Sequence, residues 1–214
     1  MTARDTLKDS AHFERFMQSK REDIASRNHG PLPGDCYDIM AAMYSAGYPI
    51  DDLKPIYEMA ISSVDRLPKP IGVTQLLWFG VLLGVDSQQH ATLQRIVDRL
   101  LGYQAFAVFL ADTLKISHPD RIDREGLPKF FPRVRDMATD EERQSYLGEY
   151  VRRYWYNANR VEYWWGQHKG GAIRYFGYWA WDVAATVRAY GLDDSSFCDC
   201  KYYPVDLAHY LDGK

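Results

Sequence analysis

The helical class of this chain is indicated most clearly by residues 139–161, which read TDEERQSYLGEYVRRYWYNANRV. Thr139, followed three residues later by Glu142, matches a capping box, in which each side chain accepts a hydrogen bond from the other residue's backbone amide. Apolar and aromatic residues then recur at spacings of three and four: Tyr146, Leu147, Tyr150, Val151, Tyr154, Trp155, Ala158 and Val161. This period predicts a long amphipathic helix with one buried face.

The same period continues through most of the chain, and no convincing alternation of period two occurs. Further helices are expected over residues 4–26, 35–46, 51–64, 71–83, 87–101, 103–114 and 172–190. Gly84 and Gly191 are each followed by an apolar residue and then by Asp and Ser, a pattern that ends one helix and caps the next. The sequence therefore predicts an all-α fold, in which antiparallel helix pairs pack as a compact bundle with two closely packed halves.

Residues 116–138 interrupt this pattern. Pro119, Gly126, Pro128 and Pro132 lie there among alternating charges, which predicts a crossover rather than a helix pair. The expected organisation is an N-terminal helical domain over residues 1–115, the crossover over 116–138, and a C-terminal helical domain over 139–214.

Composition and charge restrict the class of function. Of 214 residues, 46% are hydrophobic and 14% aromatic, which favours a packed core over disorder. The formal net charge of −3 argues against a free-standing nucleic-acid binder. The charged N-terminus lacks an apolar signal region, and the longest apolar stretch, of about ten residues, is too short to span a bilayer. With only three cysteines, the chain is expected to be cytoplasmic, with reduced thiols and no membrane contact.

Motifs for metal binding and catalysis are incomplete. Cys198, Cys200 and His209 form the only local Cys/His group, and half of a four-ligand zinc site is missing. Pro119-Asp120 lacks the downstream Asp/Glu-x-Lys of a restriction-like nuclease, and residues 166–171 lack the spacing of a phosphate-binding loop. We therefore expect no metal, no cofactor and no enzymatic activity. A small helical nuclease and a non-catalytic scaffold of a bacterial complex are the alternatives.

Three C-terminal segments carry a resemblance to a known family. They are Gly177–Asp182 (GYWAWD), Gly191–Ser196 (GLDDSS) and Tyr202–Leu207 (YYPVDL), and together they resemble the C-terminal domain of PoNi-type immunity proteins. Asp182 stands where the family usually has Glu, which keeps the carboxylate. Arg4–Asp9, followed by Phe13, is similar to the start of the accompanying N-terminal domain.

The resemblance implies an all-α, non-catalytic protein that binds a PoNe-type DNase toxin in the cytoplasm. Such toxins have a restriction-like fold and are often delivered by a type VI secretion system. The inferred mechanism is occlusion of the toxin. No direct contact with nucleic acid is expected.

Candidate partner-binding residues come from a local excess of acid. Five aspartates and one lysine lie between residues 193 and 212, and such a surface suits the basic face that a nuclease presents to DNA. The acidic candidates are Asp193, Asp194, Asp199 and Asp206, and Tyr202 and Tyr203 are candidate aromatic anchors, because interface hot spots favour Tyr and Trp. A structural role is the alternative for Asp193 and Asp206, and burial in the core is the alternative for the two tyrosines.

A second set of residues in the same segments is assigned to the structure. It comprises Tyr178, Trp179, Trp181, Asp182, Gly191 and Pro204. Asp182 is expected to be a buried packing anchor that bonds a Tyr, Trp or Arg side chain. Pro204 is expected in the first turn of a last short helix.

Overall fold

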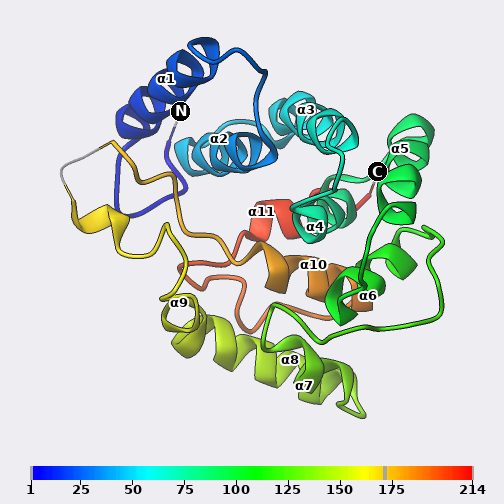
Figure 1. The fold of residues 1–214 in the computed structure, drawn as a ribbon. Coiled ribbons are helices and arrows are strands. Elements are labelled where there is room, and N and C mark those ends of the chain that lie inside the picture. The colour runs from blue at the N-terminus through cyan, green and yellow to red at the C-terminus, as the bar shows by residue number, and fades with distance from the viewer. Residues whose placement is uncertain (1, 171–172, 214) are drawn as a thin grey trace.

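The computed structural model describes residues 2–170 and 173–213, and this part of the chain is helical with no β-strand (Figure 1). The expected all-α class is confirmed. In chain order the α-helices are α1 (Ser10–Ala25), α2 (Pro33–Ala46), α3 (Lys54–Asp65), α4 (Val73–Leu83), α5 (Ser87–Asp98), α6 (Ala105–Thr113), α7 (Phe131–Arg135), α8 (Asp140–Glu149), α9 (Trp155–Ala158), α10 (Trp181–Tyr190) and α11 (Val205–Ala208). Short 3-10 turns occur at η1 (Ile50–Leu53) and η3 (Gln167–Lys169), and a π-helical turn, η2 (Tyr150–Tyr154), joins α8 to α9. None of the described helices is both long and apolar enough to cross a bilayer.

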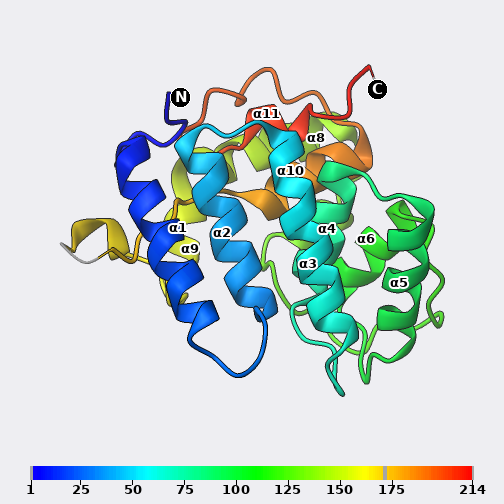
Figure 2. The same ribbon diagram turned by 90° about the horizontal axis from the view of Figure 1, so that it is seen from above.

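The helices surround a central pair, α4 and α10. Helices α1, α2 and α3 lie side by side on one flank, and the α8–α9 rod crosses the opposite flank (Figures 1 and 2). The central position of α4 follows from its sequence, VTQLLWFGVLL, because a helix that is apolar on nearly every face must be covered on every side. Residues 181–187 of α10 are buried for the same reason.

Side-chain caps fix where several helices begin. The side chain of Asp9 accepts the His12 amide at 2.8 Å at the start of α1. At α8 the expected capping box is present, because Thr139 Oγ1 accepts the Glu142 amide and Glu142 Oε2 accepts the Thr139 amide, each at 3.2 Å. These bonds pair backbone amides that a helix N-terminus otherwise leaves without partners.

The long helix expected over residues 139–161 ends earlier than predicted. The rod of α8, η2 and α9 stops at Ala158, and Val161 is 83% exposed rather than inward. Asn159 gives the reason, because its side-chain amide donates to the Trp155 carbonyl at 2.8 Å. A side chain that bonds a carbonyl of the last turn offers the backbone an alternative to continuing the helix.

The helix expected over residues 172–190 is wrong in its first half. Helix α10 begins at Trp181, and residues 175–180 are non-helical. Gly177 has φ +111°, which no L-residue helix contains, and a Cβ there would collide with Ser45 Oγ. Ile173 is 44% exposed, although it was expected to face inward. Gly171 and Ala172 lie outside the described residues.

The two expected glycine hinges differ from each other. Gly191 takes the left-handed conformation, and the Leu192 amide bonds the Val187 carbonyl at 2.9 Å, as the Schellman pattern requires. No helix begins directly after it, because residues 195–199 form turns and Asp193 accepts the Ser195 amide at 2.9 Å. Gly84 has φ +75° and ψ 159°, a positive-φ conformation essentially restricted to glycine, so it does not form the expected left-handed helical cap, although α5 does begin after it.

Candidate partner-binding site

The first motif segment, Gly177–Asp182, is bonded to α2 inside the protein. Trp179 Nε1 donates to Ser45 Oγ at 2.7 Å, and Ser45 in turn donates to the Phe176 carbonyl at 3.1 Å. Tyr44 packs edge-on against Trp179 and Trp181, with ring centroids 4.8 and 5.1 Å apart. Ser45 thereby pairs both the Trp179 indole N–H and the Phe176 carbonyl, which holds the extended segment against α2.

Asp182 is buried beside this cluster, with 9% of its surface exposed. Its Oδ1 accepts Trp155 Nε1 at 3.1 Å and the Val183 amide at 3.0 Å. Burial raises the pKa of Asp182 to about 6, although these donors favour the charged form. The bond to Trp155 links α10 to the α8–α9 rod.

Two of the six partner-binding candidates are internal. Asp194 and Tyr203 are 4% and 3% exposed, and the Tyr203 hydroxyl donates to Asp194 Oδ2 at 2.6 Å. His209 Nε2 lies 3.0 Å from Asp194, and its Nδ1 lies 2.6 Å from Asp212. The hydrogen bond to Asp212 raises the pKa of His209 most, and the bond to Asp194 raises it further. This network fixes the course of residues 191–212 rather than presenting Asp194 to a partner.

The other four candidates reach the surface. Asp193, Asp199 and Asp206 are exposed, and Asp206 forms an ion pair with Arg4 Nε at 2.6 Å. Tyr202 is half-buried, and its ring stacks on Tyr156 at 5.4 Å. Residues 193–206 therefore present three exposed carboxylates, and their contact with a partner stays a prediction.

The cysteines and Pro204 are the next residues that the sequence analysis singled out. Cys198 and Cys200 are half-buried free thiols, and Cys36 is a buried one. Within residues 2–170 and 173–213, no group of three or more His, Cys, Asp or Glu side chains has metal-binding geometry. Pro204 directly precedes α11 and acts as its N-cap.

A cleft that the sequence did not reveal opens between α1 and the segment that follows α9. It has a volume of about 270 Å³, and we call it the α1 cleft. Its lining residues are Phe16, Ser19, Lys20, Asp23, Asp38, Tyr163, Gln167, Ile173, Arg174 and Phe176. One wall therefore comes from α1 and α2, and the other from residues far along the chain.

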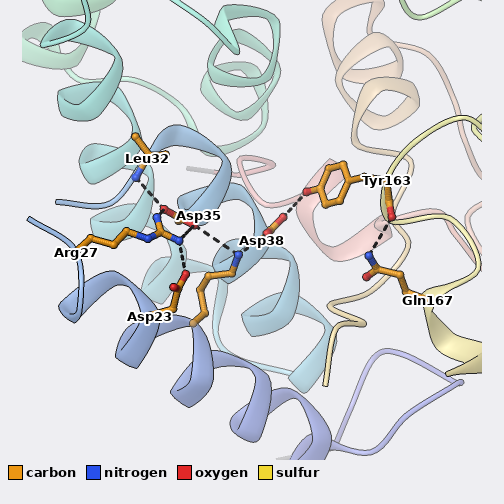
Figure 3. A network of polar contacts seen from close by, with 8 residues as sticks. Asp23, Arg27, Leu32, Asp35, Asp38, Tyr163 and Gln167 are labelled. Carbon is orange, nitrogen blue, oxygen red and sulfur yellow. Dashed lines mark hydrogen bonds and ion pairs between the residues drawn. The ribbon is translucent and has the colours of Figure 1, made fainter. Parts of the chain in front are cut away.

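A polar network forms the floor of the α1 cleft (Figure 3). Asp38 accepts Lys20 Nζ at 2.9 Å and the Tyr163 hydroxyl at 2.6 Å. Burial raises the pKa of Asp38, whereas the bonds from Tyr163 and Lys20 act in the opposite direction. The side chain of Gln167 donates to the Tyr163 carbonyl at 2.9 Å, so the segment that carries Tyr163 is held from both sides.

A second carboxylate extends the network along α1. Asp35 accepts Arg27 at 2.6 Å and the Leu32 amide at 2.9 Å, and Lys20 Nζ lies 3.5 Å from it. Arg27 also pairs with Asp23 (Figure 3). The three carboxylates of this network therefore share two cations, Lys20 of α1 and Arg27 of the loop that follows it.

The sequence did contain a signal for this network. Asp35 and Asp38 are one turn apart on a helix that is otherwise almost wholly apolar, and carboxylates at such positions are rarely buried without cationic partners. Lys20 and Arg27 are two turns apart and supply those cations. Tyr163 could not be assigned in this way, because its place depends on where α9 ends.

Comparison with known proteins agrees with the motif segments. Residues 109–207 match a family model described as PoNe immunity proteins (PoNi), C-terminal. The resemblance carried by residues 177–207 is thus confirmed. The match begins in α6 and includes one wall of the α1 cleft, whereas α1 and α2 lie outside it. No curated protein and no solved structure matches the chain.

Proposed function

Because residues 109–207 belong to the C-terminal family of PoNe immunity proteins, we propose that this chain binds a cognate PoNe-type nuclease toxin and neutralises it by occlusion. The family match is the observation that carries the proposal. The described structure is compatible with a binding protein, since its buried carboxylates are engaged in structural bonds. We further propose that binding takes place in the cytoplasm of a cell that meets the toxin through a type VI secretion system.

Exposed carboxylates supply the first contribution to this binding. A nuclease presents positive charge to DNA phosphates, so an acidic surface attracts the same face. Asp193, Asp199 and Asp206 are the exposed acids of residues 193–207, at the end of the family-matched region. Exposed charges at the edge of an interface act mainly on the association rate, because water and salt screen them.

The test is co-expression of the chain with its cognate toxin domain, scored by bacterial survival and by co-purification. Rescue with a stable complex supports immunity by direct binding, whereas unrelieved toxicity without a complex contradicts it. Nuclease activity of the purified chain would instead favour the enzyme alternative.

A charge-neutralised variant then tests the acidic contribution. Replacing Asp193, Asp199 and Asp206 together by Asn is expected to slow association and to flatten its salt dependence. The matched control replaces three exposed acids outside the family match, Glu22→Gln, Glu58→Gln and Asp98→Asn, and is expected to leave association unchanged. Equal association rates for both triple variants would remove the acidic segment from the interface.

A further inference from the structure

The α1 cleft has the composition of a pocket for a partner's side chain. Its apolar walls are Phe16, Phe176, Tyr163 and Ile173, and the last two are 66% and 44% exposed. Aromatic and apolar side chains left exposed around a recess are typical of the centres of protein interfaces. A volume of about 270 Å³ is small for a cofactor-sized ligand, for which pockets of roughly 300–1,000 Å³ are usual.

The polar groups of the cleft indicate the charge of the occupant. Asp23 and Asp38 are already paired with Arg27 and Lys20. Arg174, in contrast, forms no hydrogen bond or ion pair with any residue in 2–170 or 173–213. Arg174 is therefore the one charged lining residue without a partner among the described residues, and its guanidinium can bind a carboxylate.

A second polar atom of the cleft has no partner. Gln167 donates through Nε2 to Tyr163, but its Oε1 is buried without a hydrogen bond from the described residues. A buried acceptor without a donor is unfavourable, but this atom has almost no accessible surface, so it is not a contact for an entering group. Arg174 is therefore the unfilled polar position of the cleft, and it fits a carboxylate.

The segment that ends at Arg174 carries a net positive charge. Residues 152–174 contain five basic residues and a single acid, Glu162. Nucleic acid is the other partner that a basic and aromatic surface fits. A phosphate backbone, however, binds along a groove of several free cations, whereas Arg174 is the one lining cation of this cleft without a partner among the described residues. A single carboxylate fits this arrangement better than a run of phosphates.

We propose that the α1 cleft receives an acidic segment of the toxin, with a carboxylate on Arg174 and an apolar or aromatic side chain against Phe16, Tyr163 and Phe176. This inference rests on the proposed function. It adds a basic contact of this chain, Arg174, to the acidic contact formed by its residues 193–206. Toxin surfaces of both signs then meet the immunity protein, which restricts the orientation of the complex.

The experiment measures binding of the purified full-length chain to the cognate toxin domain by calorimetry. Arg174→Glu and Ile173→Ser are each expected to weaken binding, the charge reversal by roughly tenfold or more. Lys129→Glu is the matched control, because Lys129 is also an exposed cation of the family-matched region without an ion pair to a described residue. The affinity of this control variant for the toxin domain is expected to change less than about twofold. Melting temperatures of the three variants are expected to match that of the parent, since these side chains anchor no helix.

The outcomes separate the two proposals. If the unmodified chain does not bind the toxin, the proposed function fails and the cleft proposal fails with it. If the unmodified chain binds and both cleft variants bind equally well, the proposed function stands and the cleft proposal is overturned. Binding of a DNA oligonucleotide that Arg174→Glu abolishes would overturn it in favour of a nucleic-acid site.

Discussion

The buried carboxyl of Asp182 makes the stability of this fold depend on pH. Its pKa is raised from 3.8 to about 6 by burial. Below about pH 4 the group is neutral in both the folded and the unfolded chain, so it does not disfavour folding. As the pH rises, the unfolded chain loses this proton first, so stability falls between about pH 4 and pH 6 and stays at the lower level above that window. At about 1.4 kcal/mol for each pKa unit, the loss is about 3 kcal/mol.

Asp182→Asn removes this titration and keeps most of the geometry. The amide Oδ1 can still accept the bonds from Trp155 Nε1 and the Val183 amide. The new side-chain N–H group lacks an acceptor and costs about 1–3 kcal/mol, but that cost is the same at every pH. The expected result is that the parent chain loses about 3 kcal/mol more unfolding free energy than the variant between about pH 4 and pH 7.

Urea unfolding followed by circular dichroism at the two pH values measures this difference. Other titrating groups are shared by both proteins, so they cancel in the comparison. Asp193→Asn is the control, because Asp193 is exposed and its bonds to Ser195 lower its pKa instead of raising it. Parallel loss of stability in the parent and in Asp182→Asn would refute the assignment of a raised pKa to this carboxyl.

Two further predictions concern the motif segments. Gly177→Ala combines an unfavourable φ of +111° with a clash at Ser45, so it is expected to lower the unfolding free energy by several kcal/mol. Gly191→Ala has open space around its Cβ, so it is expected to lower the unfolding free energy by only about 1–2 kcal/mol. Thermal unfolding of the two variants gives the comparison, and equal losses would contradict it. Tyr203→Phe removes the O–H donor of a buried carboxylate and is expected to cost about 1–3 kcal/mol in urea unfolding. Tyr202→Phe is expected to change the unfolding free energy little, because the Tyr202 hydroxyl has no partner among the described residues. A larger loss in Tyr202→Phe than in Tyr203→Phe would contradict the assignment of the buried bond to Tyr203.

The sequence predicted most helices of the first half of the chain closely, but the helix expected from residue 4 begins only at Ser10, where Asp9 caps it. The expected ranges 35–46, 71–83 and 103–114 differ from α2, α4 and α6 by two residues or fewer at either end. These helices obey local rules, because their apolar period and their breakers agree. The capping box at Thr139 was found for the same reason.

Long-range bonds explain where the prediction was wrong. Residues 173–180 have helical spacing, but Gly177 and the bond from Trp179 to Ser45 of α2 hold the segment in a non-helical conformation. No local pattern reveals a partner more than 130 positions away. The α1 cleft was missed on the same ground, since its two walls come from opposite ends of the sequence.

The two halves expected from the sequence are joined by polar bonds as well as by packing. Trp179 bonds Ser45, Tyr163 bonds Asp38, and Tyr175 bonds Asp5 at 2.5 Å. In each pair the aromatic side chain belongs to the family-matched region and its partner to the first 46 residues. A buried polar group that loses its partner carries its full desolvation cost, so neither half keeps its own surface unchanged without the other. Residues 109–207 identify the family, but the surface on which we place the toxin's acidic segment exists only where α1 and α2 meet them.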